Sequence, residues 1–286
     1  PGVRHQWDVK EMSPPSGRMS ASSREERPAV RNLSSLGYTS PMCGRYALEA
    51  PRSQLSQRFG LDECAEFAVR YNIAPGTDIP VVRQSPNGQR VLHLLHWGLL
   101  PHWAKDPAIA TRLINARGES VAEKPSFRDA FRQRRCLIPA SGFYEWKSAT
   151  TGPQARLKQP CYISLKSGET MAIGGLWESW TSPAGKLIPS CCIITTAANE
   201  MMRPIHERMP LIVAARDWQD WLAAPADQVI GLIQPCPGDQ LQAWTVNRRV
   251  GKAAEEGPDL ILALPGEAPP TAAAPVRSTR TKRAAQ

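Results

Sequence analysis

Residues 161–196 read CYISLKSGETMAIGGLWESWTSPAGKLIPSCCIITT, and this stretch decides the predicted fold class. It contains three short runs rich in apolar, aromatic and β-branched residues, at Cys161–Leu165, Met171–Trp177 and Cys191–Thr196. Gly, Pro and Ser residues separate the runs, as is typical of turns between strands. Strand patterns do not alternate strictly with helix patterns, so the segment favours an antiparallel sheet over repeated βαβ units.

Further strand-like and helix-like runs extend this pattern in both directions. Strands are predicted at Ile79–Arg83, Val91–Trp97, Cys136–Pro139, Pro210–Ala214 and Leu241–Val246, and helices at Ser53–Phe59, Ser126–Arg134, Arg216–Ala223 and Ala226–Gln234. Ser126 with Asp129 three positions later is close to a capping box. The predicted fold is α+β: a single domain with a curled, largely antiparallel β-sheet, barrel-like in its core, and peripheral helices.

The composition excludes several classes of protein. The 286 residues are 42% hydrophobic and 21% charged, which argues against a disordered polyelectrolyte. No apolar run is long enough for a membrane span and no signal-peptide pattern opens the chain, so an intracellular protein is expected. Residues 1–42 and 265–286 are rich in Pro, Ser or Ala and are expected to be disordered, whereas 43–264 is expected to form the folded domain.

The net charge of +9 is a weak indicator of nucleic-acid binding. Residues 1–41 hold six basic and four acidic residues, and residues 265–286 hold four basic and one acidic residue. More than half of the excess charge therefore lies in the two ends. The seven cysteines form no CxxC pair, and neither GxGxxG nor a P-loop sequence occurs, so no metal and no cofactor are predicted.

Met42 and Cys43 open the predicted folded domain. If Met42 is an initiator that is removed, Cys43 gains a free α-amine beside its thiol. Such an amine, with a pKa of about 7.7–8.0, can attack an aldehyde to form a Schiff base at neutral pH. The thiol can then close a five-membered thiazolidine ring. The competing interpretation is that Cys43 is a small buried hydrophobic residue.

Three other motifs carry candidate chemistry. Asn115 and Arg117 lie two residues apart, so on an extended segment they face the same side and could anchor a phosphate or orient a nucleophile; a polar loop is the alternative. Glu145 lies among aromatics, and burial of the Phe143 face would raise its pKa and suit it to acid/base work. His206 precedes a predicted strand, where a structural histidine is the alternative to a functional one.

Taken together, the motifs resemble the SOS response-associated peptidase (SRAP) family. The matching stretches are MCGRY (42–46), YNIAPG (71–76), WGLLPHW (97–103), INARGES (114–120), RCLIPASGFYEW (135–146), GGLWESW (174–180) and HERMP (206–210). The resemblance implies an SRAP fold and a covalent sensor of abasic sites in single-stranded DNA, which shields the lesion from strand breakage and removes its own initiator Met or N-terminal segment. A lyase-type activity is also implied.

The resemblance also assigns roles to single residues. It implies that Cys43, Asn115, Glu145 and His206 are catalytic: Cys43 forms the thiazolidine, Asn115 orients the amine and the opened sugar, Glu145 is the acid/base, and His206 shuttles protons. It implies DNA contacts by Arg45, Pro75, Trp97, Arg117 and Arg208. The expected partner is single-stranded DNA with abasic sites, bound by a monomer in the bacterial cytoplasm at the nucleoid and not at a membrane.

One feature departs from the family pattern, because 41 residues precede Met42. Three explanations compete: translation starts at Met42, the segment is removed autocatalytically, or the segment stays and leaves a protein that only binds DNA. Two other functions stay open at this point. One is a cysteine peptidase acting on proteins with Cys43 as nucleophile and His206 as base, and the other is a non-catalytic single-stranded DNA-binding module.

Overall fold

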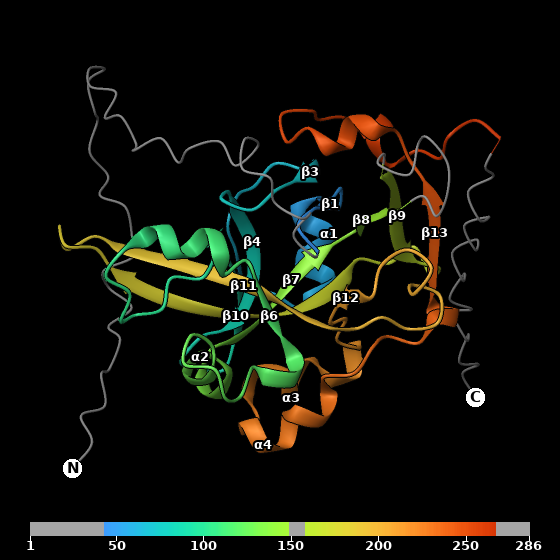
Figure 1. Cartoon of the computed structure of the whole chain (residues 1–286). Helices are drawn as coiled ribbons and strands as arrows, with labels where there is room; N and C mark the ends of the chain where they lie inside the picture. The colour runs from blue at the N-terminus through green and yellow to red at the C-terminus, as the bar shows by residue number, and fades with distance from the viewer. Residues whose placement is uncertain (1–42, 149–157, 267–286) are drawn as a thin grey trace, which may run out of the picture. The chain divides into compact units, whose positions relative to one another are not determined.

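The computed structural model describes residues 43–148 and 158–266. It confirms the α+β class, with many strands and a few short helices (Figure 1). The strands are β1 Tyr46–Leu48, β2 Glu63–Cys64, β3 Arg70–Ile73, β4 Asp78–Gln84, β5 Arg90–Trp97, β6 Asn115–Arg117, β7 Arg135–Ala140, β8 Gly142–Lys147, β9 Gln159–Leu165, β10 Met171–Thr181, β11 Leu187–Ala197, β12 Arg208–Pro210 and β13 Leu241–Thr245. The α-helices are α1 Arg52–Phe59, α2 Arg128–Gln133, α3 Trp218–Ala223 and α4 Ala226–Val229, and short 3₁₀ helices join the elements.

Five strands close into a barrel. The sheet runs in the order β11-β10-β7-β4-β5, and β5 pairs again with β11. All of these pairings are antiparallel except the closing one, in which His96 and Trp97 of β5 lie parallel to Ser190 and Cys191. The prediction of a curled, largely antiparallel sheet with a barrel-like core is therefore confirmed. Closure pairs strand edges that would otherwise be exposed.

β11 is the strand on which the rest of the barrel depends. One of its edges pairs with β10 through Ile193 and then with β12 through residues 195–197. Its other edge pairs with β5 and then with β6, so that Asn115 lies beside Ile193 and Arg117 beside Thr195. The short strands β6 and β12 are thus held on opposite sides of the same stretch of β11.

A second sheet lies against the barrel and has the order β13-β9-β8-β1-β3. In Figure 1 its strands β9 and β13 stand beside the group formed by β4, β7, β10 and β11. β1 bridges the two sheets, because the Tyr46 ring packs edge-on against Trp97 of the barrel with centroids 5.5 Å apart. Both rings are almost fully buried. This packing fixes the place at which the chain enters the domain.

The helices pack on the outside of the barrel through buried apolar side chains. Phe59 of α1 stacks on Trp218 of α3 with ring centroids 4.5 Å apart. Arg135 of β7 is 4% exposed, and its guanidinium donates to the carbonyls of Phe131 and Trp221, which belong to α2 and α3. The last carbonyls of a helix have no N–H donor within the helix. The buried Arg135 guanidinium supplies that donor for both short helices.

Two predicted elements needed correction. The strand expected at Pro210–Ala214 is instead β12 at Arg208–Pro210, because residues 208–210 pair with β11 and beyond them only Ile212 forms an isolated bridge. The helix expected from Ser126 begins at Arg128, and Phe127 caps it without a side-chain hydrogen bond, so no capping box forms. The predicted disordered ends lie outside the described residues, apart from residues 265 and 266. Within the described part of the chain, no helix is both long and apolar enough to cross a membrane.

Candidate active site

Cys43 and Glu145 meet because β1 and β8 run side by side. Tyr46 pairs with Phe143 and Ala47 with Gly142, so the antiparallel register carries the residues before β1 toward Glu145. The backbone N–H of Cys43 donates to Glu145 Oε1 at 2.7 Å. Both residues are 3% exposed. The pairing of two strands far apart in sequence therefore holds the nitrogen of Cys43 against a buried carboxyl group.

Burial controls the protonation of this pair. It raises the pKa of the Glu145 carboxyl, while nearby His206 and hydrogen bonds from Cys43 and Trp146 act in the opposite direction. Burial likewise raises the pKa of the Cys43 thiol, and Glu145 raises it further, against a smaller lowering by Arg208. Both groups are thus biased toward their protonated forms. The thiol is neutral at pH 7, and the carboxyl group holds its proton to a higher pH than an exposed glutamate does.

The backbone of Cys43 is in an uncommon conformation. Its φ of +46° is the only positive value at a non-glycine residue in the described ranges. A side chain in the left-handed region costs about 1–2 kcal/mol. Such values cluster at functional sites. The backbone of Cys43 is therefore held in a costly conformation by its surroundings.

His206 and Arg208 are fixed by a short backbone turn into β12. The backbone N–H of Arg208 donates to His206 Nδ1 at 3.0 Å. This bond needs a lone pair on Nδ1, so the neutral ring carries its proton on Nε2. His206 is half-buried and close enough to Glu145 to lower the pKa of its carboxyl group. The site therefore contains an acid and a histidine next to the nitrogen of Cys43.

Arg208 lies across β11. Its guanidinium donates to Thr195 O at 2.7 Å and to both carboxylate oxygens of Glu119. Glu119 follows β6 on the other edge of β11. On β6 itself, Asn115 is half-buried and Arg117 is exposed. The structure thus brings Asn115, Arg117 and Arg208 around one segment of β11, as the order of pairing described above requires.

Three residues that the resemblance assigned to DNA contacts have other surroundings. Trp97 is 0% exposed and donates from Nε1 to Ile114 O at 3.0 Å, so its ring packs in the core and offers no open face to a base. Arg45 is part-buried and donates from Nη1 to Asn72 Oδ1 and to Val250 O, each at 2.7 Å. Pro75 is half-buried in the turn between β3 and β4.

Sequence reasoning missed three residues that build the site. Asn72 is 0% exposed and positions Arg45, while Thr195 and Glu119 hold Arg208. Asn72 and Glu119 lie in the quoted stretches YNIAPG and INARGES, so position within a motif was a signal for both. Nothing in the sequence marks Thr195, because its role depends on the pairing of β11.

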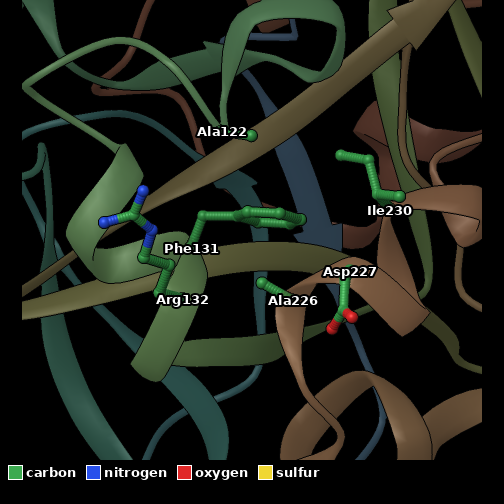
Figure 2. Close-up of a pocket in the computed structure, with 6 residues that line it drawn as sticks. All are labelled: Ala122, Phe131, Arg132, Ala226, Asp227 and Ile230. Atoms are coloured by element: carbon green, nitrogen blue, oxygen red, sulfur yellow. The ribbon is translucent and has the colours of Figure 1, made fainter.

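A separate cavity of about 190 Å³ lies between α2 and α4 (Figure 2). Its lining is mainly apolar and consists of Ala122, Phe131, Arg132, Ala226, Asp227 and Ile230. None of the predicted site residues contributes to it. No cluster of three or more His, Cys, Asp or Glu side chains that could hold a metal ion occurs among residues 43–148 and 158–266.

Comparison with known proteins gives consistent matches. The profile of the family described as "SOS response associated peptidase (SRAP)" matches residues 42–253. The abasic site processing protein YoqW of Bacillus subtilis is 38% identical over 226 residues, which are 77% of this chain and 99% of that protein. The abasic site processing protein HMCES of Xenopus tropicalis is 27% identical over 232 residues, 70% of this chain and 67% of that protein.

Solved structures show the same fold. A crystal structure of a Bacteroides thetaiotaomicron protein superposes with a TM-score of 0.67 at 22% identity and covers 78% of this chain and 100% of that one. One of a Bordetella bronchiseptica protein has a TM-score of 0.62 at 26% identity, covering 72% of this chain and 100% of that one.

Proposed function

The chain belongs to the SOS response associated peptidase family, and we propose that it processes abasic sites in single-stranded DNA by forming a covalent link through Cys43. The observation that carries this proposal is the 2.7 Å contact between the Cys43 nitrogen and Glu145 Oε1 in a buried position. That nitrogen is an amide in the present chain. It occupies the position that a free α-amine takes once Cys43 is the first residue.

The reaction balances without a cofactor. The lone pair of the Cys43 amine attacks the aldehyde carbon of the ring-opened abasic sugar, and loss of one water molecule gives an imine. The sulfur then adds to the imine carbon while the thiol proton passes to the nitrogen, which closes a thiazolidine. Glu145 accepts the amine proton and returns a proton to the departing water. In this order the amine reacts before the thiol. The order suits the site because burial keeps the Cys43 thiol neutral at pH 7.

The surrounding residues have matching roles in the proposal. His206 presents a proton on Nε2 near Glu145 and can relay it to the sugar. Asn115 orients the amine and the opened sugar, and Arg117 and Arg208 contact the flanking phosphates. Since the substrate is chromosomal single-stranded DNA, the expected place of action is the bacterial nucleoid.

The chemistry requires that the residues before Cys43 be absent. We include in the proposal that the protein removes this segment itself, by hydrolysis of the peptide bond before Cys43. A water molecule supplies the hydroxyl that the carbonyl carbon keeps and the proton that the Cys43 nitrogen gains. The left-handed backbone of Cys43 supports this step, because φ is defined only while a preceding peptide unit is attached. Cleavage therefore removes the constraint that fixes this φ.

The test is a denaturing gel of protein that begins at Cys43, mixed with abasic single-stranded DNA and no reductant. A slower band that survives denaturation is expected. It should be absent for Cys43→Ser and for protein with an acetylated α-amine, and full-length chain should form it only after processing. The proposal is wrong if protein that begins at Cys43 gives no such band.

The structure disfavours a cysteine peptidase that acts on other proteins. Such enzymes lower the pKa of the nucleophilic thiol so that the thiolate is present at neutral pH. Here the pKa of the Cys43 thiol is raised, first by burial and then by Glu145. Turnover of peptides in trans by protein trimmed to Cys43 would reverse this conclusion.

A further inference from the structure

Arg208 is occupied in the free protein. Its two terminal nitrogens bind the two carboxylate oxygens of Glu119, and Nη2 also binds Thr195 O and Thr195 Oγ1. Bidentate pairing of this kind uses the same planar fork of donors with which arginine binds phosphate. A phosphate and the Glu119 carboxylate therefore compete for one face of the guanidinium.

The exposures show which group an incoming strand meets first. The Arg208 side chain is 13% exposed, whereas that of Glu119 is 56% exposed. The carboxylate therefore lies on the solvent side of the guanidinium. Thr195 contacts Arg208 from β11 and does not depend on Glu119. If the Glu119 carboxylate moves away, the Arg208 guanidinium keeps its hydrogen bond to Thr195 O, and the donors that faced Glu119 are free to bind a phosphate.

We propose that Glu119 is a positioning residue that holds Arg208 in place of a DNA phosphate, and that a strand must displace Glu119 to bind. This inference rests on the proposed function, in which Arg208 contacts the DNA backbone. The bond to Arg208 lowers the pKa of Glu119, so the carboxylate is ionised and paired at neutral pH. The exchange lowers affinity for any single strand and favours strands that gain further contacts in the site.

The exchange has a signature in salt dependence. When a phosphate binds a free arginine, the DNA releases about 0.7 of a counterion for single strands. When the phosphate displaces Glu119, the freed carboxylate stays near the strand and its charge offsets part of the neutralisation, so fewer counterions are released. Removing the Glu119 charge should therefore strengthen binding and also make it more sensitive to salt.

The experiment measures binding of an undamaged single-stranded oligonucleotide by fluorescence anisotropy over a range of salt concentrations. Glu119→Gln should bind about two- to fivefold more tightly than wild type, with a log–log salt slope steeper by up to about 0.7. Glu207→Gln is the matched control, because Glu207 is an exposed acid next to Arg208 in sequence and no side-chain bond joins the two. We expect the control to stay within about twofold of wild type.

Two further variants separate pairing from general charge. Glu119→Asp keeps the charge but shortens the side chain, so it should lie between wild type and Glu119→Gln. In an Arg208→Gln background, Glu119→Gln should have no effect. Equal effects of Glu119→Gln and Glu207→Gln would overturn the inference, as would weaker binding by Glu119→Gln at unchanged melting temperature. Wild-type protein that binds no single-stranded DNA would overturn the proposed function as well.

Discussion

Replacing Glu145 by Gln should change stability and reactivity in opposite directions. The carboxyl group is 3% exposed, and burial is the main cause that raises its pKa above the ordinary 4.5. The folded state therefore binds this proton more tightly than the unfolded state does. The stability that Glu145 contributes is complete below pH 4.5 and is lost as the pH rises through the folded-state pKa. Gln at this position has no charge to bury and removes that loss.

The size of the effect follows from one proton. Between the unfolded and folded pKa values, the free energy of unfolding falls by at most about 1.4 kcal/mol per pH unit. The difference between Glu145→Gln and wild type should therefore increase with pH from 4.5 and then level off. His206 and the Cys43 thiol face the same carboxyl group. Both lower the pKa of Glu145 against the larger effect of burial, so they narrow this interval and leave its sign unchanged.

The assay is chemical denaturation of both proteins from pH 4.5 to 8, with Glu207→Gln as an exposed control. In parallel, adduct formation with abasic DNA should be about 10²–10⁴-fold slower in Glu145→Gln, since a general acid/base contributes that much. Gln can still accept the bond from the Cys43 nitrogen, so the final yield should change little. Stability curves of Glu145→Gln and wild type that stay parallel across this pH range would refute the reasoning, and so would an adduct rate within tenfold of wild type.

Two other predictions concern the frame of the site. Gly118→Ala should destabilise the fold by about 1–3 kcal/mol in urea denaturation, because a Cβ there would lie 2.3 Å from Ile233 Cγ2 and 3.2 Å from Thr195 O; unchanged stability would show that Ile233 gives way freely. Glu178→Gln should lower the melting temperature by several degrees, because it removes the charge that pairs with Arg134 at 2.7 Å in a side chain that is only 6% exposed. An unchanged melting temperature would contradict this.

The sequence predicted strands well where burial and turns coincide. The runs Met171–Trp177 and Cys191–Thr196 do form strands. The strands are longer than predicted, because β10 continues to Thr181 and β11 begins at Leu187, where polar and exposed residues still pair. The alternation of buried and exposed positions along a strand could not decide whether Glu145 is buried. Phe143 and Tyr144 are both buried, so both faces of β8 are covered. The sequence predicted a barrel-like core but not which strands close it, because the β5–β11 pairing joins residues more than 90 positions apart.

The predicted site residues stay predictions, but the structure shows which of them lie in contact. Cys43 and Glu145 were singled out from local chemistry, but their contact depends on the register of β1 and β8. Trp97 could not be distinguished from a surface tryptophan, because its burial depends on Tyr46 and on barrel closure. Sequence motifs reveal which side chains are present, whereas strand pairing decides which of them meet.

The dependence of the site on β11 imposes an order in time. Cys43 emerges early in synthesis, but Glu145 follows 102 residues later and Arg208 later still. At ordinary synthesis rates of about 5–20 residues per second, the interval between Cys43 and Arg208 lasts on the order of ten to thirty seconds. A nascent chain with Cys43 at its start therefore carries an aminothiol with the reactivity of free cysteine. Selectivity for a DNA lesion begins only when the barrel closes.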